Sequence, residues 1–181
     1  MTFLVRILGA VLLTAAVIGA VSLGAAGGGG RGGPVATPHA APEFTGIDTW
    51  INSAPLSMAQ LRGKAVLVDF WTFDCINCQN TLPYVKEWDR KYRDKGLVVV
   101  GVHTPEFAFE RKLDKLETAV KRNAISYPVA QDNGFGTWKA WNNVYWPAAY
   151  LVDRNGQVVY THFGEGDYAQ TEAAIRKALE L

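Results

Sequence analysis

The fold of this chain is decided by residues 66–78, which read VLVDFWTFDCINC. The first five of these residues are β-branched, aliphatic or aromatic except for Asp69, and such a run predicts a strand that is buried on both faces. Apolar residues recur at helical spacing beyond the second cysteine and predict a helix there. Cys75 and Cys78, the only cysteines of the chain, therefore lie at a strand-to-helix turn.

A thiol at the start of a helix is expected to be acidic and reactive. The backbone N–H groups that open a helix have no partner inside it and, together with the helix dipole, they favour negative charge and lower the pKa of a nearby thiol. We therefore expect Cys75 to be the nucleophile and Cys78, one turn into the helix, to be the resolving thiol.

Other uses of a Cys-X-X-Cys pair fit the sequence less well. A zinc site usually needs four ligands, but the chain has no second cysteine pair and only three scattered histidines, His39, His103 and His162. Covalent haem attachment requires histidine after the second cysteine, where this chain has Gln79. We therefore expect no metal and no cofactor besides the redox-active cysteine pair, although an inert structural disulfide remains an alternative.

Composition limits the architecture and the partners. A chain of 181 residues, 49% of them hydrophobic, can bury one sizeable core, so one folded domain is expected. Acidic and basic residues are mixed along the chain, and the formal net charge is +1. This balance suggests neither nucleic acid nor an anionic membrane surface as a partner.

The amino-terminal part has the composition of an export segment. Residues 7–26 follow Arg6 and carry no charge. Twenty helical residues span roughly 30 Å, which favours an uncleaved membrane anchor, whereas the small residues at 24–26 suit cleavage as a signal peptide. In either case the positive-inside tendency places the folded domain outside the cytoplasm, in the periplasm or cell envelope.

The chain is thus expected to have three parts. Residues 1–26 are a signal peptide or signal anchor, residues 27–42 form a tether rich in Gly, Ala and Pro that includes an inert His39, and residues 43–181 form the folded domain.

Within that domain the patterns predict alternating strands and helices. Residues 97–102 form a second buried strand, and Thr104-Pro105-Glu106 starts a helix with a capping hydroxyl, a proline and an acid. Such β-α-β-α order is typical of a parallel sheet. The other expected elements are a short hairpin around residues 50–55, an extended piece at 127–131, a short helix at 134–141, strands at 148–153 and 157–163 joined by an Asn-Gly turn, and a last helix capped by Asp167.

These elements and several motifs resemble the thioredoxin fold, and in particular its exported TlpA/ResA/DipZ-type branch. The resemblance covers roughly residues 43–181 and is strongest to the soluble domain of DipZ-type proteins, which also carry a membrane-spanning electron-transfer domain. It implies an α/β fold with a central mixed β-sheet flanked by helices, here with a short N-terminal β-hairpin extension. The motifs that carry it are LRGK at 61–64, DFW at 69–71, CINC at 75–78, TLPY at 81–84, GVHTPEF at 101–107, YWP at 145–147 and FGEGDY at 163–168.

The resemblance assigns roles to two residues outside the cysteine pair. Asp69 occupies the position of the buried acid of thioredoxins, and a buried carboxyl group has a raised pKa that lets it exchange a proton near pH 7. We expect it to accept the proton of Cys78, the alternative being a purely structural acid. Pro147 corresponds to the proline that thioredoxin-like proteins hold in cis beside the cysteines, the alternative being an ordinary trans proline that starts an edge strand.

Several further residues are candidates for substrate recognition or modulation. Phe73 and Trp146 are expected to line a docking patch beside the redox pair, although aromatic residues are more often part of the core. Asp74 replaces the aromatic residue that precedes the first cysteine in many thioredoxins. His103 and Glu165 are possible modulators, against the alternatives of a structural histidine and a solvated turn.

The expected function is that of an extracytoplasmic thiol-disulfide oxidoreductase, and of a reductase of protein disulfides in particular. The resemblance implies protein thiols and disulfides as substrates, apocytochrome c among them, and re-reduction by a membrane electron carrier of the CcdA/DsbD type. One alternative is a peroxidase, because Thr72 and Cys75 match part of the peroxiredoxin signature, whose proline would fall at Val68. Another is a non-catalytic module that holds a partner through the aromatic residues.

Overall fold

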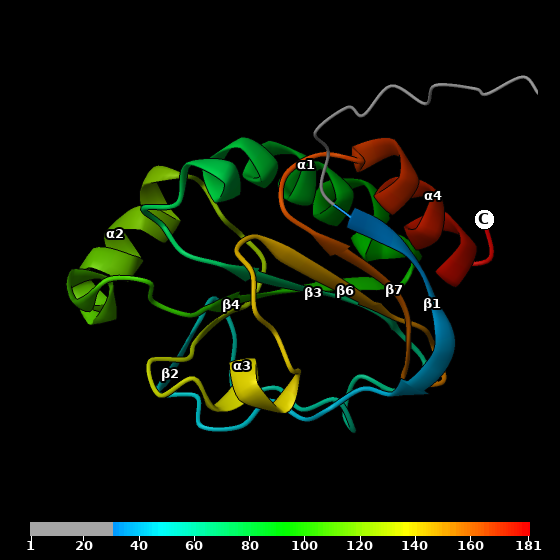
Figure 1. The fold of residues 1–181 in the computed structure, drawn as a ribbon, viewed down its shortest axis with the longest axis horizontal. Helices are drawn as coiled ribbons and strands as arrows, with labels where there is room; N and C mark the ends of the chain where they lie inside the picture. Colours follow the sequence, from blue (N-terminus) through cyan, green and yellow to red (C-terminus); the bar gives the residue numbers. More distant parts are fainter. Residues whose placement is uncertain (1–30) are drawn as a thin grey trace, which may run out of the picture.

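A computed structural model of the chain describes residues 31–181, and the expected export segment at residues 1–26 lies outside this range. The described residues form one sheet of seven strands with helices on both of its faces (Figure 1). The strand order is β1-β7-β6-β3-β4-β5-β2. The strands are β1 (Arg31–Ala40), β2 (Thr49–Ile51), β3 (Ala65–Trp71), β4 (Leu97–His103), β5 (Val129–Gln131), β6 (Ala148–Val152) and β7 (Gln157–Phe163).

The strand predicted from residues 66–70 is the middle of this sheet. All seven residues of β3 are buried, as expected for an apolar strand covered on both faces. It runs parallel to β4, with Val68 opposite Val100, and antiparallel to β6, with Val68 opposite Tyr150. The predicted mixed sheet is confirmed, and the Asn-Gly turn joins β6 and β7, with Gly156 in the left-handed region at a φ of 71°.

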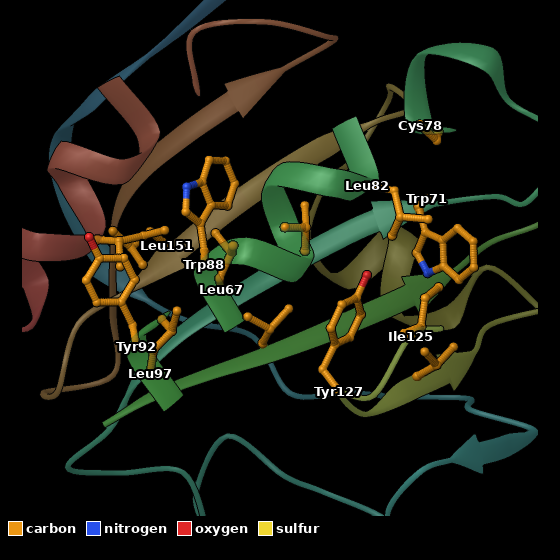
Figure 2. Close-up of a cluster of buried hydrophobic side chains, with 14 of the residues drawn as sticks. Leu67, Trp71, Cys78, Leu82, Trp88, Tyr92, Leu97, Ile125, Tyr127 and Leu151 are labelled. Carbon is orange, nitrogen blue, oxygen red and sulfur yellow. The ribbon is translucent and has the colours of Figure 1, made fainter. Parts of the chain in front are cut away.

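Helices α1, α2 and α4 cover one face of the sheet, and the short α3 lies on the other with the segment that leads from β1 to β3 (Figure 1). The larger of two hydrophobic cores lies on the first face, where side chains of β3 and β4 pack against α1 (Figure 2). The second core joins the opposite side of β3 to Trp138 and Trp141. The helices are α1 (Ile76–Tyr92), α2 (Leu113–Arg122), α3 (Gly136–Ala140) and α4 (Tyr168–Ala178), with short 3-10 helices η1 (Arg93–Lys95) and η2 (Ala108–Arg111).

The amino-terminal extension differs from the expected hairpin. The strands β1 and β2 lie at opposite edges of the sheet, where β1 pairs with β7 and β2 pairs with β5. Each strand thus finds its partner more than 70 residues away, which a local turn pattern cannot indicate. Ten residues of the stretch expected to be a tether form β1.

Two helix starts also differ from the prediction. The helix expected at residue 104 begins as η2 and becomes α-helical only at Leu113. In this α-helix Leu116 and Val120 are buried, whereas Leu113 is exposed. The reason is that the side chain of Glu110 accepts hydrogen bonds from the free N–H groups of Glu106 and Phe107 and closes a separate turn. Asp167 precedes α4 in a left-handed conformation, and its side chain makes no capping bond.

No helix within residues 31–181 combines the length and the apolar character needed to cross a bilayer.

Candidate active site

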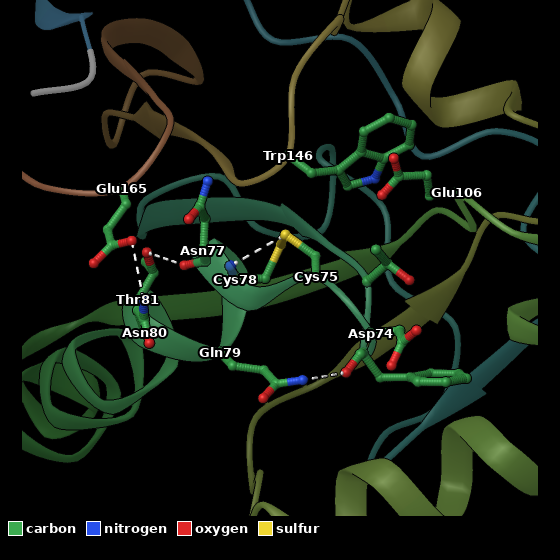
Figure 3. Close-up of a disulfide and its surroundings, with 12 residues drawn as sticks. Asp74, Cys75, Asn77, Cys78, Gln79, Asn80, Thr81, Glu106, Trp146 and Glu165 are labelled. Atoms are coloured by element: carbon green, nitrogen blue, oxygen red, sulfur yellow. Dashed lines mark hydrogen bonds between the residues drawn. A yellow bond between two sulfur atoms is a disulfide. The ribbon is translucent and has the colours of Figure 1, made fainter. Parts of the chain in front are cut away.

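The two cysteines form a disulfide at the start of α1, at the point where the chain leaves β3 (Figure 3). Their Cα atoms are 5.2 Å apart. Cys75 is the N-cap of the helix, in extended conformation, and its Sγ accepts the backbone N–H of Cys78 at 3.2 Å. The sulfur of Cys75 therefore lies where the unpaired N–H groups of a helix stabilise a thiolate.

Exposure distinguishes the two sulfur-bearing side chains. Cys78 is 4% exposed and belongs to the core between β3 and α1, whereas Cys75 is half-buried and packs at the edge of that core. A substrate can therefore reach Cys75 more readily than Cys78. This asymmetry matches the roles expected of a nucleophile and a resolving thiol.

Asp69 is a buried acid on the same strand that leads to the cysteines. It is 4% exposed, and the residues opposite it on β4 and β6 are small, namely Gly101 and Ala149. Burial raises the pKa of Asp69 from 3.8 to about 7, because desolvation disfavours the charged form. The group is thus able to accept and release a proton at neutral pH.

Trp146, which precedes Pro147, forms a wall beside the disulfide (Figure 3). The peptide bond between them is cis, as expected. The Trp146 indole lies next to Cys75 (Figure 3) and is held by its N–H, which donates to the Thr104 carbonyl at 3.0 Å, and by Trp138, whose ring centre is 4.2 Å away. The indole is therefore a fixed, half-buried surface next to the reactive sulfur.

Phe73 does not provide the docking surface that we expected of it. Its side chain is 9% exposed and stacks on the ring of His103 with centroids 5.3 Å apart. The ring is part of the larger core, on the face of the sheet that α1 covers. Phe73 is thus a structural aromatic residue rather than an exposed contact.

His103 lies wholly inside the molecule. Burial lowers its pKa to about 4, so the imidazole is neutral at pH 7, and its Nε2 lies 3.2 Å from the Thr72 hydroxyl. Glu165 is half-buried in the loop between β7 and α4, where it accepts the Asn80 side-chain amide at 3.1 Å (Figure 3). Glu165 thus contacts α1 two residues beyond Cys78, whereas His103 contacts the segment before Cys75.

Comparisons with known proteins agree with this geometry. A model of the Redoxin family matches residues 37–179, which is most of the chain. The chain belongs to the Redoxin family. The family and the thioredoxin-like fold inferred from the motifs are thereby confirmed.

Two relatives of this Redoxin-family chain show how much of a longer and of a shorter protein it matches. It is 47% identical over 142 residues to protein DipZ of Mycobacterium tuberculosis, a match that covers 77% of the chain and 20% of DipZ. It is 29% identical over 138 residues to the thiol-disulfide oxidoreductase YkuV of Bacillus subtilis, covering 76% of the chain and 93% of YkuV. The chain thus spans about a fifth of the length of DipZ and nearly all of YkuV.

A solved structure confirms the architecture of this Redoxin-family chain. The solution structure of a thioredoxin-like protein in the oxidized form superposes with a TM-score of 0.72 at 30% sequence identity, covering 79% of the chain and 96% of that protein.

The structure of this Redoxin-family chain adds residues that the sequence patterns did not indicate. Tyr127 is buried, and burial together with the negative charges of Asp69 and Asp89 raises the pKa of its hydroxyl well above the usual value. Ile76 and Val144 are large apolar side chains that remain exposed, within two residues of Cys75 and of Trp146 in the sequence. The position of Tyr127 depends on the pairing of distant strands, whereas the exposed side chains could have been suspected from their neighbours.

Between residues 31 and 181, no three His, Cys, Asp or Glu side chains are grouped closely enough to hold a metal ion.

Proposed function

We propose that this chain is a thiol-disulfide oxidoreductase that reduces disulfides of exported proteins outside the cytoplasm. The observation that carries the proposal is the placement of an accessible Cys75 sulfur at the start of α1, in front of a buried Cys78. The names of the relatives support the chemistry, and the apolar residues 7–26 support the location.

The first step is attack on a substrate disulfide. In the reduced protein the Cys75 thiolate attacks one substrate sulfur, a mixed disulfide forms, and the other substrate sulfur leaves as a thiolate. The helix start lowers the cost of holding negative charge on Cys75 before the attack. The exposed side chains of Ile76 and Tyr145 and the fixed indole of Trp146 offer apolar surface to the substrate segment that carries the disulfide.

The second step releases the reduced product. Cys78 gives its proton to the carboxylate of Asp69, and the resulting thiolate attacks the Sγ of Cys75. The second substrate sulfur leaves as a thiolate and the Cys75–Cys78 disulfide forms. Two electrons have then passed from the protein to the substrate, and Asp69 holds the proton until it is released.

A new cycle needs an electron donor outside the cytoplasm. We propose a membrane electron carrier of the CcdA/DsbD type for this role, since exported dithiols are otherwise oxidised. Apocytochrome c is a fitting substrate class, because its haem-binding cysteines must be reduced before haem attachment. Both assignments depend on the family resemblance.

A peroxidase is a weaker alternative, for a structural reason. The Thr72 hydroxyl, which would have to assist a peroxide at Cys75, is buried and donates to the side chain of Glu110. It also lies 3.2 Å from His103. The hydroxyl is therefore already engaged away from the reactive sulfur.

Trapping of substrates tests the proposed function. Cys78→Ala should stall the reaction at the mixed disulfide, so exported proteins with cysteines should be recovered covalently bound to Cys75 and identified by mass spectrometry. Cys75→Ala is the matched control and should trap none. If a double alanine variant supports the same cellular function as the parent, the protein is a binding module and the proposal is wrong.

A further inference from the structure

Glu110 is a buried acid to which the mechanism above gives no task. Its side chain is completely shielded from solvent in η2. Its carboxylate nevertheless accepts hydrogen bonds from four donors. These are the hydroxyl of Thr72, the backbone N–H of Asp74 at 3.2 Å, and the backbone N–H groups of Glu106 and Phe107, both at 2.7 Å.

The two oxygens of this carboxylate serve different segments. Oε2 binds the N–H groups of Glu106 and Phe107, which lie just before η2. This is the usual task of an acid at the third position of a helix, since the first N–H groups of a helix lack partners. Local capping therefore explains Oε2 in full.

Local capping does not explain the other oxygen. Oε1 binds Thr72 and Asp74, which are 38 and 36 residues away in the sequence and form the turn between β3 and Cys75. Asp74 is the last residue before the cysteine that caps α1. Oε1 thus holds the backbone at the position that decides where the Cys75 sulfur lies.

The segment bound by Oε2, which contains Glu106 and Phe107, is also connected to the Trp146 indole on the other side of the site. Two residues before Glu106, the Thr104 N–H donates to the Trp71 carbonyl at 3.1 Å, and the Thr104 carbonyl accepts the indole N–H of Trp146 at 3.0 Å. Glu106 and Trp146 lie on the same side of the disulfide (Figure 3). One carboxylate therefore connects the turn that presents the nucleophile to the loop that holds the Trp146 indole.

We propose that Glu110 is a positioning residue that sets the Cys75 sulfur against the Trp146 wall, so that a substrate polypeptide can engage both at once. This inference rests on the proposed function and names the residue that gives its site a fixed geometry. A protein substrate needs both surfaces in register, whereas a small reagent needs only the sulfur. Comparing a protein substrate with a small reagent therefore distinguishes a positioning role from a general loss of stability.

Glu110→Gln removes the hydrogen bond to Asp74 and can keep the other hydrogen bonds of this side chain. The amide oxygen can keep the bonds to Glu106 and Phe107, and the amide nitrogen can donate to the Thr72 hydroxyl. The amide nitrogen cannot accept from the Asp74 N–H, which then faces another donor. The substitution thus loosens the turn before Cys75 while it preserves the cap of η2.

The test compares the reduction of insulin disulfides with the alkylation of Cys75 by iodoacetamide, both in the full chain. For Glu110→Gln we expect kcat/KM for insulin to fall at least about tenfold, because misplacement by about 1 Å can cost 10²-fold. Alkylation of Cys75 should stay within about threefold of the parent, because iodoacetamide needs only an accessible thiolate.

Asp153→Asn is the matched control. Asp153 accepts the backbone N–H groups of Asn155 at 2.9 Å and Gln157 at 2.8 Å in the turn between β6 and β7. This turn lies at the end of the sheet opposite the cysteines, because β6 runs antiparallel to β3. Asp153→Asn removes a carboxylate charge as Glu110→Gln does, but its amide oxygen can accept both N–H groups, so the variant should reduce insulin as fast as the parent.

The outcomes distinguish this inference from the proposed function. If the parent does not reduce insulin or any other protein disulfide, the proposed function fails. If the parent is active and Glu110→Gln matches it, Glu110 is only a helix cap and the inference is overturned. Should Glu110→Gln not fold, Thr72→Val removes one donor to Oε1 and leaves the η2 cap intact, so an unchanged insulin rate in that variant overturns the inference as well.

Discussion

Asp69 shows how the surroundings of one residue determine its chemistry. Its pKa of about 7 results from desolvation on a strand that is covered on both faces, so the carboxyl group gains and loses its proton near neutral pH. The same burial has a kinetic and a thermodynamic consequence, and each can be measured separately.

The kinetic consequence concerns the second step. Asp69 must be ionised to accept the proton of Cys78, so we expect the rate of resolution to rise with pH between about pH 6 and 8, around the pKa of the acid. Asp69→Asn should slow resolution at pH 7 by about tenfold or more and leave mixed disulfides on Cys75. Single-turnover kinetics with a protein disulfide measure this rate, and turnover within about twofold of the parent would exclude the proton-acceptor role.

The thermodynamic consequence has a defined sign. The pKa of Asp69 is higher in the folded protein than in the unfolded chain, so the folded state binds more protons and stability is lost as the pH rises from about 4 through 7. Relative to Asp69→Asn, the parent should lose about 2–3 kcal/mol of unfolding free energy between pH 5 and pH 9. Urea unfolding of both proteins at the two pH values measures the difference, and a constant difference would contradict the buried pKa.

Asp74 is the charged residue next to the nucleophile in sequence. Its side chain is exposed and does not cap α1, because Cys75 itself occupies the N-cap. The Asp74 carboxylate therefore opposes a thiolate on Cys75, and neither Ile76 nor Asn77 brings a compensating positive charge. The dithiol should consequently be a good reductant, with a potential nearer the roughly −270 mV of thioredoxin than the roughly −120 mV of DsbA.

Removal of that charge gives a test. Asp74→Ser should lower the pKa of Cys75 and shift the potential in the oxidising direction by less than about 30 mV, because solvent screens an exposed charge. Equilibration against glutathione measures both potentials. A parent value above about −180 mV, or a shift towards more reducing values, would show that other groups set the potential.

At the scale of elements, the packing of β3 against β4 depends on a glycine. Gly101 lies opposite Asp69, and a Cβ atom there would come within 2.9 Å of the Trp71 indole nitrogen and 3.1 Å of the Tyr127 ring. Both rings are buried and have little room to move. The strand β4, which pairs with the strand that carries Asp69, therefore has no room for a larger side chain at this position.

Gly101→Ala should for this reason destabilise the protein by about 1–3 kcal/mol. Gly134→Ala is the control, because no atom lies within 4 Å of a Cβ at that position. Denaturant unfolding should show a lower midpoint for the first variant and an unchanged midpoint for the second. Equal stability of the two variants would mean that the rings relax around the added methyl group.

At the scale of the whole molecule, the proposed function requires the folded domain to reach an oxidising compartment. If the apolar residues 7–26 direct export, as we propose, alkaline phosphatase fused after Leu181 should be active in bacterial cells. A fusion that starts at residue 43 is the control and should be inactive. Activity of both fusions, or of neither, would argue against export by this segment.

The sequence by itself determined the redox centre and its setting. The apolar run, the Cys-X-X-Cys pair and the helical spacing after it are local patterns, and local patterns are enough to predict a strand that turns into a helix at two cysteines. The buried position of Asp69 followed from the same run, and motif order was enough to identify the fold.

Only the tertiary structure decided which distant groups meet at that centre. Glu110 reaches Thr72, the Tyr127 ring lies against Gly101 opposite Asp69, and Phe73 is buried on His103, because strands far apart in the sequence are neighbours in the sheet. The edge positions of β1 and β2 have the same origin. Such contacts depend on which strand pairs with which, and side-chain periodicity along one segment carries no information about its partner.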